Sequence, residues 1–237
     1  AQVQSDGSVQ HEDDAMAERQ QVRCEVYVAL FSFSRTTRLP LCGPSGSTQT
    51  ELLSRRGNAV PTDYWMSDGG VAPDAGFNSS SVVDTNWALG SSNLSTERYQ
   101  AAIAYLFAHQ ASSGGFPASE VGPETVAGTA LIGRELAILS KRLTGTQKVS
   151  LAAAAAWVEG QADSPGVWGS LYDTALAHLF LVLQLPDPAR EAITYEHLVG
   201  QQQADGSWLG DPFVTALVLR AAAARSLPKV VESGFKL

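Results

Sequence analysis

The chain has 237 residues, of which 44% are hydrophobic and 17% charged, and this balance excludes wholesale disorder and allows one sizeable core. Its formal net charge is −8, and its 16 Lys and Arg residues are scattered along the chain, which argues against a nucleic-acid partner. The longest nearly uncharged apolar stretch, Leu171 to Leu185, is shorter than the roughly 20 residues that a membrane-spanning helix needs. We expect one domain over residues 1–237 and no membrane span.

The chain begins Ala1-Gln2-Val3-Gln4 without an initiating Met, as chains often do after a signal peptide has been removed. We therefore expect a secreted or cell-surface protein. Two Asn-x-Ser sequons, at Asn78 and Asn93, are candidate glycosylation sites and fit that expectation.

Both cysteines, Cys24 and Cys42, lie in the first fifth of the chain and form no Cys-x-x-Cys pair. This spacing argues against a zinc ribbon and against a thioredoxin-type site. A single disulfide between them and two buried free thiols both remain open.

In chain order, two weak copies of a helix–turn–helix unit come first. One has Gln2, Gly7 and Val9 leading to a helix around 25–30, and the other has Gly76-Phe77 leading to a helix that opens at Asp84-Thr85. Between them, Thr36 to Asp74 is rich in Pro, Gly, Ser and Thr and predicts a long loop with one short helical segment around 50–56. Loops of that length are often functional, so this segment is a candidate for contacts with a partner.

Three clear copies of the unit follow. Each joins a helix that ends in Gln to a Gly-containing turn closed by an aromatic residue, and the turn leads to an Ala/Leu-rich helix with Thr at its start. The glutamines are Gln110, Gln161 and Gln202, and the aromatic residues are Phe116, Trp168 and Trp208. Starting from Phe77, successive aromatic residues are 39, 52 and 40 residues apart, which fits one pair of helices per unit. Because strand signals are almost absent, the sequence predicts an all-α fold of about five tandem helix pairs.

The stretches Tyr105 to Phe116 and Leu198 to Trp208 match the QW motif of squalene and oxidosqualene cyclases, and Trp157 to Trp168 fits it with a one-residue shift. The chain thus resembles the terpenoid cyclase and protein prenyltransferase β-subunit superfamily. The resemblance implies an α/α toroid of inner and outer helices, or an open arc if the ring has only about five pairs.

In that family the motif's Gln caps backbone groups at a neighbouring helix terminus and stacks on the aromatic ring. The resemblance therefore makes six residues structural staples between units. They are Gln110, Phe116, Gln161, Trp168, Gln202 and Trp208. An aromatic box for a cation or a polyene is the functional alternative for the same residues.

The catalytic motifs of the family are incomplete. Class II cyclases place an Asp-x-Asp-Asp run before a Thr-Ala helix start, where neighbouring carboxylates allow one to hold and donate a proton. Aligned on that start, this chain keeps only the last Asp of the run, as Asp84 and as Asp173. The cluster 12–14 (Glu-Asp-Asp) has His11 in the place of the first Asp and no Thr-Ala after it, and a solvated acidic turn explains it.

The zinc site of the prenyltransferases has no counterpart in the sequence either. It needs an Asp, a nearby Cys and a distant His, and neither cysteine here has a ligand-spaced Asp. The histidines lie on separate elements with no His-x-x-x-His pair; they are His11, His109, His178 and His197. We expect no metal and no cofactor, since nucleophile-elbow, phosphate-loop, dinucleotide and thioester motifs are missing as well.

Intact staples without complete catalytic motifs lead to the main expectation, a non-catalytic secreted toroid module that binds a protein partner or self-assembles. The alternative is a divergent toroid enzyme, either a terpene-type cyclase or a polysaccharide lyase, using Asp84, Glu124 and Asp173. By the resemblance, these three begin inner helices and point to the central cavity. Helix N-terminal capping is the competing explanation for all three.

A further alternative is a carrier of a hydrophobic small molecule. Trp87, Tyr172 and Phe180 would then line an apolar central cavity. Ordinary core packing explains the same three aromatic residues.

Overall fold

A computed structural model of the chain describes residues 2–3, 9–10, 60, 62–73, 77–90 and 94–224, and every structural statement below concerns these residues. Two strands of two residues each, β1 (Gln2–Val3) and β2 (Val9–Gln10), pair antiparallel. The other regular elements in these ranges are helices, so the all-α prediction is confirmed.

Seven α-helices and two short 3₁₀ helices make up the described fold. In chain order they are η1 Thr62–Tyr64, α3 Val82–Leu89, α4 Thr96–Ala108, α5 Val126–Ile138, η2 Ser140–Arg142, α6 Gly145–Gly160, α7 Leu171–Gln184, α8 Pro188–Gly200 and α9 Pro212–Ala223. Within the described ranges, we find no helix that combines the length and the apolar character needed to cross a membrane.

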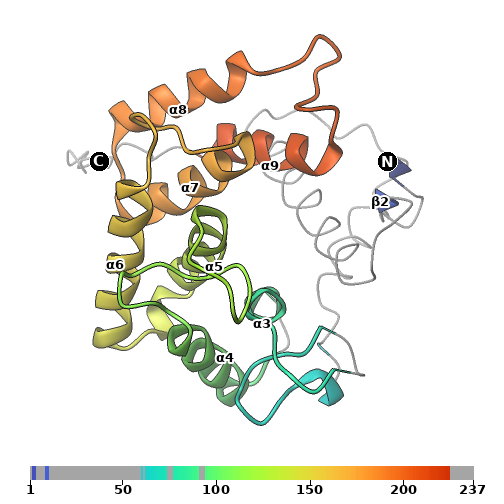
Figure 1. Cartoon of the computed structure of the whole chain (residues 1–237), viewed down its shortest axis with the longest axis vertical. Coiled ribbons are helices and arrows are strands. Elements are labelled where there is room, and N and C mark those ends of the chain that lie inside the picture. Colours follow the sequence, from blue (N-terminus) through green and yellow to red (C-terminus); the bar gives the residue numbers. More distant parts are fainter. Residues whose placement is uncertain are drawn as a thin grey trace, which may run out of the picture.

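The helices form two layers. Helices α3, α5, α7 and α9 contact one another in that order and make the inner layer. Helix α4 packs on α3, α6 lies against α5 and α7, and α8 lies against α7 and α9, so these three make the outer layer (Figure 1). Successive helices therefore alternate between layers, as in an α/α toroid.

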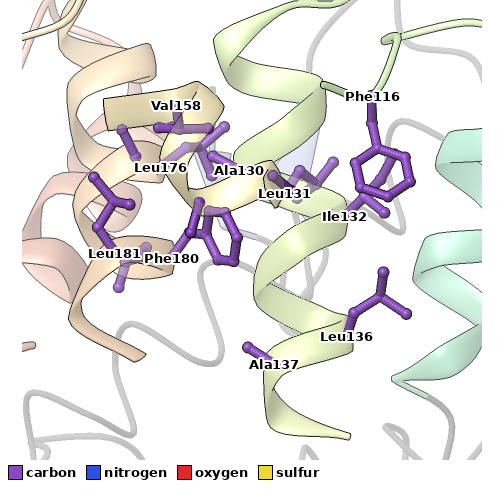
Figure 2. Packing of buried hydrophobic residues seen from close by; sticks show 14 of the residues in the cluster. Phe116, Ala130, Leu131, Ile132, Leu136, Ala137, Val158, Leu176, Phe180 and Leu181 are labelled. Carbon is purple, nitrogen blue, oxygen red and sulfur yellow. The ribbon is translucent and has the colours of Figure 1, made fainter. Parts of the chain in front are cut away.

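The core lies where the two layers meet and between α5 and α7. Phe116, Ile132, Leu136 and Phe180 are among its largest completely buried side chains (Figure 2). Helices α5 and α7 approach closely at Gly133, where an added Cβ would lie 2.5 Å from the Phe180 ring. The close packing of the inner layer thus depends on this glycine.

Four turns of one design lead toward the inner helices. Each has a glycine with a positive φ angle, which side-chain-bearing residues rarely adopt, and a buried apolar residue two positions later. These pairs are Gly69 (φ 90°) and Val71, Gly114 (φ 102°) and Phe116, Gly166 (φ 77°) and Trp168, and Gly206 (φ 84°) and Trp208.

The first of these turns corrects the sequence analysis. We expected Gly76-Phe77 to form the turn before α3, but Val71 occupies the buried position and Phe77 is 56% exposed. Residues 62–73, expected to belong to the long loop, form η1 and this turn instead. An aliphatic residue closes the turn, so a search for aromatic residues missed it. The rest of the predicted loop up to residue 59, and the short helix expected around 50–56, lie outside the described residues.

Candidate functional site

The inner helices share a threonine that holds the preceding turn. In each, the residue four positions after the N-cap accepts a hydrogen bond through its hydroxyl from the backbone N–H of the turn's buried apolar residue. The pairs are Thr85 with Val71 (2.8 Å), Thr129 with Phe116 (2.8 Å), Thr174 with Trp168 (2.9 Å) and Thr215 with Trp208 (2.9 Å). The N-caps are Ser81, Thr125, Ser170 and Asp211. The four helices can therefore be aligned residue by residue.

Two of the three predicted glutamine staples hold turns. The amide of Gln110 donates to the carbonyls of Gly114 and Ser150, both at 2.8 Å, and so joins its own turn to helix α6. Gln202 donates to Gly206 at 2.9 Å. Gln161 is itself the C-cap of α6, one position earlier than the other two; it is exposed and has no side-chain hydrogen bond within the described part of the chain. The one-residue shift in its motif thus moves its side chain away from the turn.

The two tryptophans of the turns are also engaged structurally. The indole N–H of Trp168 donates to the Val158 carbonyl at 2.7 Å, and that of Trp208 donates to the Leu198 carbonyl at 2.6 Å. Both carbonyls lie in the last turn of an outer helix, where each also accepts from the backbone N–H of the C-cap residue, Gln161 at 3.1 Å and Gln201 at 3.3 Å. Phe116 is completely buried and lies 6.2 Å from Phe107, ring centre to ring centre.

The alignment separates the three candidate carboxylates. Asp84 and Asp173 are both three positions after an N-cap, where α5 has Gly128 and α9 has Val214. Glu124 lies before the N-cap of α5, outside the helix. The structure thus places Asp84 and Asp173 at equivalent positions and Glu124 elsewhere.

Of the three carboxylates, two accept hydrogen bonds from nearby residues and one accepts none from the residues that the structure describes. The Asp173 carboxylate accepts from the Ser170 backbone N–H at 3.3 Å, as part of a capping box, and also from the Ser170 hydroxyl at 2.6 Å. Glu124 accepts from the Ser113 hydroxyl at 2.7 Å, and this hydrogen bond lowers the pKa of Glu124. The Asp84 carboxylate is half-buried and makes no hydrogen bond to the residues that the structure describes.

Asp84 shares one face of α3 with Val83 and Trp87, since residues three and four apart lie together on a helix. These three are half-buried, whereas the rest of α3 is buried. The residue aligned with Val83 is half-buried in each other inner helix, as Ala127, Tyr172 and Phe213, and the rings of the last two lie 5.8 Å apart. We call these six residues the half-buried row. It is apolar except for the tyrosine hydroxyl, the indole N–H and the Asp84 carboxylate.

Of the three aromatic residues that might line a cavity, Trp87 and Tyr172 belong to this row. Phe180 does not, because it is completely buried between α5 and α7.

A second polar cluster fixes the start of α3. The Ser80 hydroxyl donates to Asp68 at 2.6 Å, and Glu120 accepts from the Val82 backbone N–H at 2.6 Å. Burial, and then the negative charges of Glu120 and Asp68, raise the pKa of Tyr105 to about 12. Tyr105 therefore stays protonated and can donate a proton in a hydrogen bond but cannot act as a base. The side chains of this cluster come from separate segments, so no sequence spacing pointed to them; they belong to Asp68, Ser80, Tyr105 and Glu120.

Two of the three histidines in the described ranges, His109 and His178, contact carbonyls at helix ends, and the third, His197, lies in the last turn of α8. His109 contacts the Tyr105 carbonyl through Nδ1 at 2.9 Å, and His178 contacts the Ala224 carbonyl through Nε2 at 2.8 Å. Among the residues described, no three His, Cys, Asp or Glu side chains are grouped to hold a metal ion.

Of the two candidate glycosylation sites, Asn78 is exposed. The remaining candidates, Cys24, Cys42, Asn93, His11 and the acidic cluster 12–14, lie outside the described residues.

No family model and no curated protein matches the sequence. Among solved structures, the chain is similar to the apo type II terpene cyclase MstE from Scytonema, with 17% identity over 93% of this chain and 92% of that one and a TM-score of 0.52. Two structures of MstE variants, one with its substrate geranylgeranyl dihydroxybenzoate, align over the same shares at 16% identity with TM-scores of 0.45 and 0.44. The first similarity, together with the alternation of inner and outer helices, shows that this chain has a terpene cyclase-like fold.

Proposed function

We propose that the protein is a divergent toroid enzyme of the terpene cyclase type, which binds an apolar polyene along the half-buried row and protonates it from Asp84. The observation that carries the proposal is the contrast between Asp84 and Asp173. At equivalent positions, Asp173 is held in a capping box, whereas the Asp84 carboxylate is not used by its helix and shares a face with Trp87.

The chemistry fits the residue types. Asp84 in its carboxylic acid form would transfer a proton to one alkene carbon, and the neighbouring double bond would attack the resulting cation to close a ring. Transfer of a proton from an adjacent carbon to water then restores a neutral alkene, and Asp84 regains its proton from solvent, so the reaction is an isomerisation with no oxidant or reductant. The aromatic faces of Trp87 and Tyr172 can stabilise the positive charge as it forms.

A polysaccharide lyase is less well supported. Such an enzyme needs a basic side chain to abstract a proton, and it binds an anionic, strongly hydrated substrate. The half-buried row contains no Lys, Arg or His, and its one charged group is an acid.

The test is turnover by the purified protein and by a matched pair of variants. Wild type is incubated separately with squalene, geranylgeraniol and geranylgeranyl diphosphate, and cyclised products are detected by gas chromatography and mass spectrometry. We expect Asp84→Asn to reduce turnover by about 100-fold or more, since it removes the proton donor. Asp173→Asn, which changes the aligned residue, should leave turnover within about twofold once folding is matched by circular dichroism.

Three outcomes would count against the proposal. Undiminished turnover in Asp84→Asn would exclude Asp84 as the donor. Binding of a polyene without any turnover would favour the hydrophobic-ligand carrier. If the protein neither binds nor turns over a polyene, the non-catalytic module is favoured. Secretion, self-association and a protein partner stay predictions from the sequence.

A further inference from the structure

Helix α3 departs from the other inner helices at two adjacent positions. In α5, α7 and α9 the shared threonine is followed by Ala-Leu, as Ala130-Leu131, Ala175-Leu176 and Ala216-Leu217. In α3 the same two positions are Asn86 and Trp87. The three alanines are almost completely buried, so the fold itself favours a small apolar residue there.

Both departures bury polar atoms. Asn86 is completely buried, and within the described part of the chain neither its Nδ2 nor its Oδ1 has a hydrogen-bond partner. The buried indole Nε1 of Trp87 likewise has no acceptor there, whereas the indoles of Trp168 and Trp208 both donate to helix carbonyls. Burying an amide without a partner costs stability, so its presence at a position that otherwise holds alanine points to a role outside folding.

The helix geometry puts Asn86 next to the half-buried row. It lies three residues after Val83, so its side chain leaves α3 about 60° around the helix from that of Val83, away from Asp84. In α5 this side of the helix carries Gly133, which faces Phe180 of the next inner helix. The corresponding side of α3 therefore faces α5, and Asn86 lies between the half-buried row and that helix contact.

The unpaired atoms define what they can bind. An amide offers two donors and one acceptor, and an indole offers one donor. This set fits a neutral oxygen-bearing group such as a hydroxyl or a carbonyl. A diphosphate would instead require Lys or Arg. The half-buried row contains neither, and the negative charge of its Asp84 carboxylate would repel a diphosphate.

We propose that Asn86, assisted by Trp87, recognises a neutral oxygen-bearing group on an otherwise apolar ligand and is the specificity-determining residue of the site. This inference rests on the proposed function, because it assumes that the apolar part of the ligand lies along the half-buried row. It adds that the ligand is neither a plain hydrocarbon nor selected by a charged head.

Replacing Asn86 with the residue that the other repeats carry tests this. Binding of two probes, geranylgeraniol and the hydrocarbon that lacks its hydroxyl, is measured by titration calorimetry on wild type and on Asn86→Ala. Wild type should bind the alcohol about tenfold more tightly or better, and the variant should bind both within about twofold. The melting temperature of Asn86→Ala should rise by several degrees, since an unpaired buried amide is removed.

Ala130→Asn is the matched control, because it puts the same amide at the aligned position of α5. It should lower the melting temperature and leave the preference for the alcohol unchanged. An unchanged preference in Asn86→Ala would overturn the inference, with a buried water as the partner of the amide, and would leave the proposed function standing if the polyene is still turned over. A lower melting temperature of Asn86→Ala would make Asn86 a structural residue and would also overturn the inference. If wild type binds neither probe, the proposed function and the inference both fail.

Discussion

The hydroxyl of Thr174 is hydrogen-bonded to both backbone groups of Trp168: it accepts from the N–H at 2.9 Å and donates to the carbonyl at 2.6 Å. Both residues are completely buried, so neither backbone group can turn to water instead. The same arrangement joins Thr129 to Phe116, at 2.8 and 3.2 Å. A single hydroxyl thus fixes where each turn meets its inner helix.

Replacing Thr174 with Val should therefore destabilise the protein by about 2 kcal/mol, because it keeps the shape of the side chain but leaves two buried backbone groups unpaired. Urea unfolding measures the change. Thr174→Ser, which retains the hydroxyl, is the control and should cost clearly less. Equal losses in the two variants would mean that the methyl group and not the hydroxyl matters.

Trp168→Phe tests the cap on the end of α6. The variant removes the indole N–H that donates to the Val158 carbonyl but keeps an aromatic ring, as Phe116 does in the preceding unit. We expect a loss of about 1 kcal/mol with the fold retained, because one buried hydrogen bond is removed while the carbonyl keeps the Gln161 N–H as a donor. Thermal unfolding followed by circular dichroism at 222 nm gives the value, and an unchanged melting temperature would contradict the prediction.

The two glutamines of the matching motifs should behave differently. Gln110→Ala removes two hydrogen bonds, to Gly114 and Ser150, and should cost about 1–2 kcal/mol. Gln161→Ala changes an exposed side chain and should stay within about 0.5 kcal/mol of wild type. Urea unfolding of both variants gives the two losses in the free energy of unfolding. Equal losses would contradict the prediction that only the hydrogen-bonded glutamine stabilises the fold.

Gly133→Ala should destabilise by about 1–3 kcal/mol, because the new Cβ would lie 2.5 Å from the ring of Phe180. Gly160→Ala is the control: the last residue of α6 has open space around an added Cβ, so this variant should be neutral or slightly stabilised. Adding Phe180→Leu to Gly133→Ala should recover part of the loss if the clash is its cause. Differential scanning calorimetry of the set checks both points.

The stability of the protein should fall as the pH drops below the usual His range. Burial lowers the pKa of His178 in the folded state, so at acidic pH the unfolded chain binds a proton that the folded chain resists. This stability is present above pH ~6.5, the unfolded pKa, and is lost as the pH falls below it. Urea midpoints at pH 5.0 and 7.5 measure the loss. His178→Gln, which can still donate to the Ala224 carbonyl, should reduce the difference; an undiminished difference would assign it to carboxylates instead.

Much of the fold could be predicted from the sequence because each repeat contains the residues that mark where its helices begin and end. The Gly-containing turn, the buried aromatic residue and the Thr of the next helix are close together in the chain, so local pattern sufficed for the units around Phe116, Trp168 and Trp208. The alignment of the first clear unit, which set Glu124 beside Asp84 and Asp173, was off by four residues: Thr125 opens α5 as its N-cap, and Thr129 is the residue that holds the turn. Two threonines at helix spacing cannot be told apart without the turn that one of them contacts.

The candidate site was predicted only in part. Asp84 was singled out with Glu124 and Asp173, but only the side-chain contacts show that capping or a serine occupies the other two. Asn86 was not singled out, although aligning the inner helices on their threonines would have shown an amide where the others have alanine. Its lack of a partner is a property of packing and could not be read from the pattern.

The threonine hydrogen bonds have an evolutionary consequence. Since each hydroxyl contacts the turn of its own unit, a duplicated unit brings along the hydrogen bond that joins its turn to its inner helix. One inner helix could therefore accept substitutions at other positions while the remaining inner helices kept their threonine hydrogen bonds. A relative that receives the segment containing α3 by transplantation would also need a carboxylate in the place of Glu120, which holds the start of this helix.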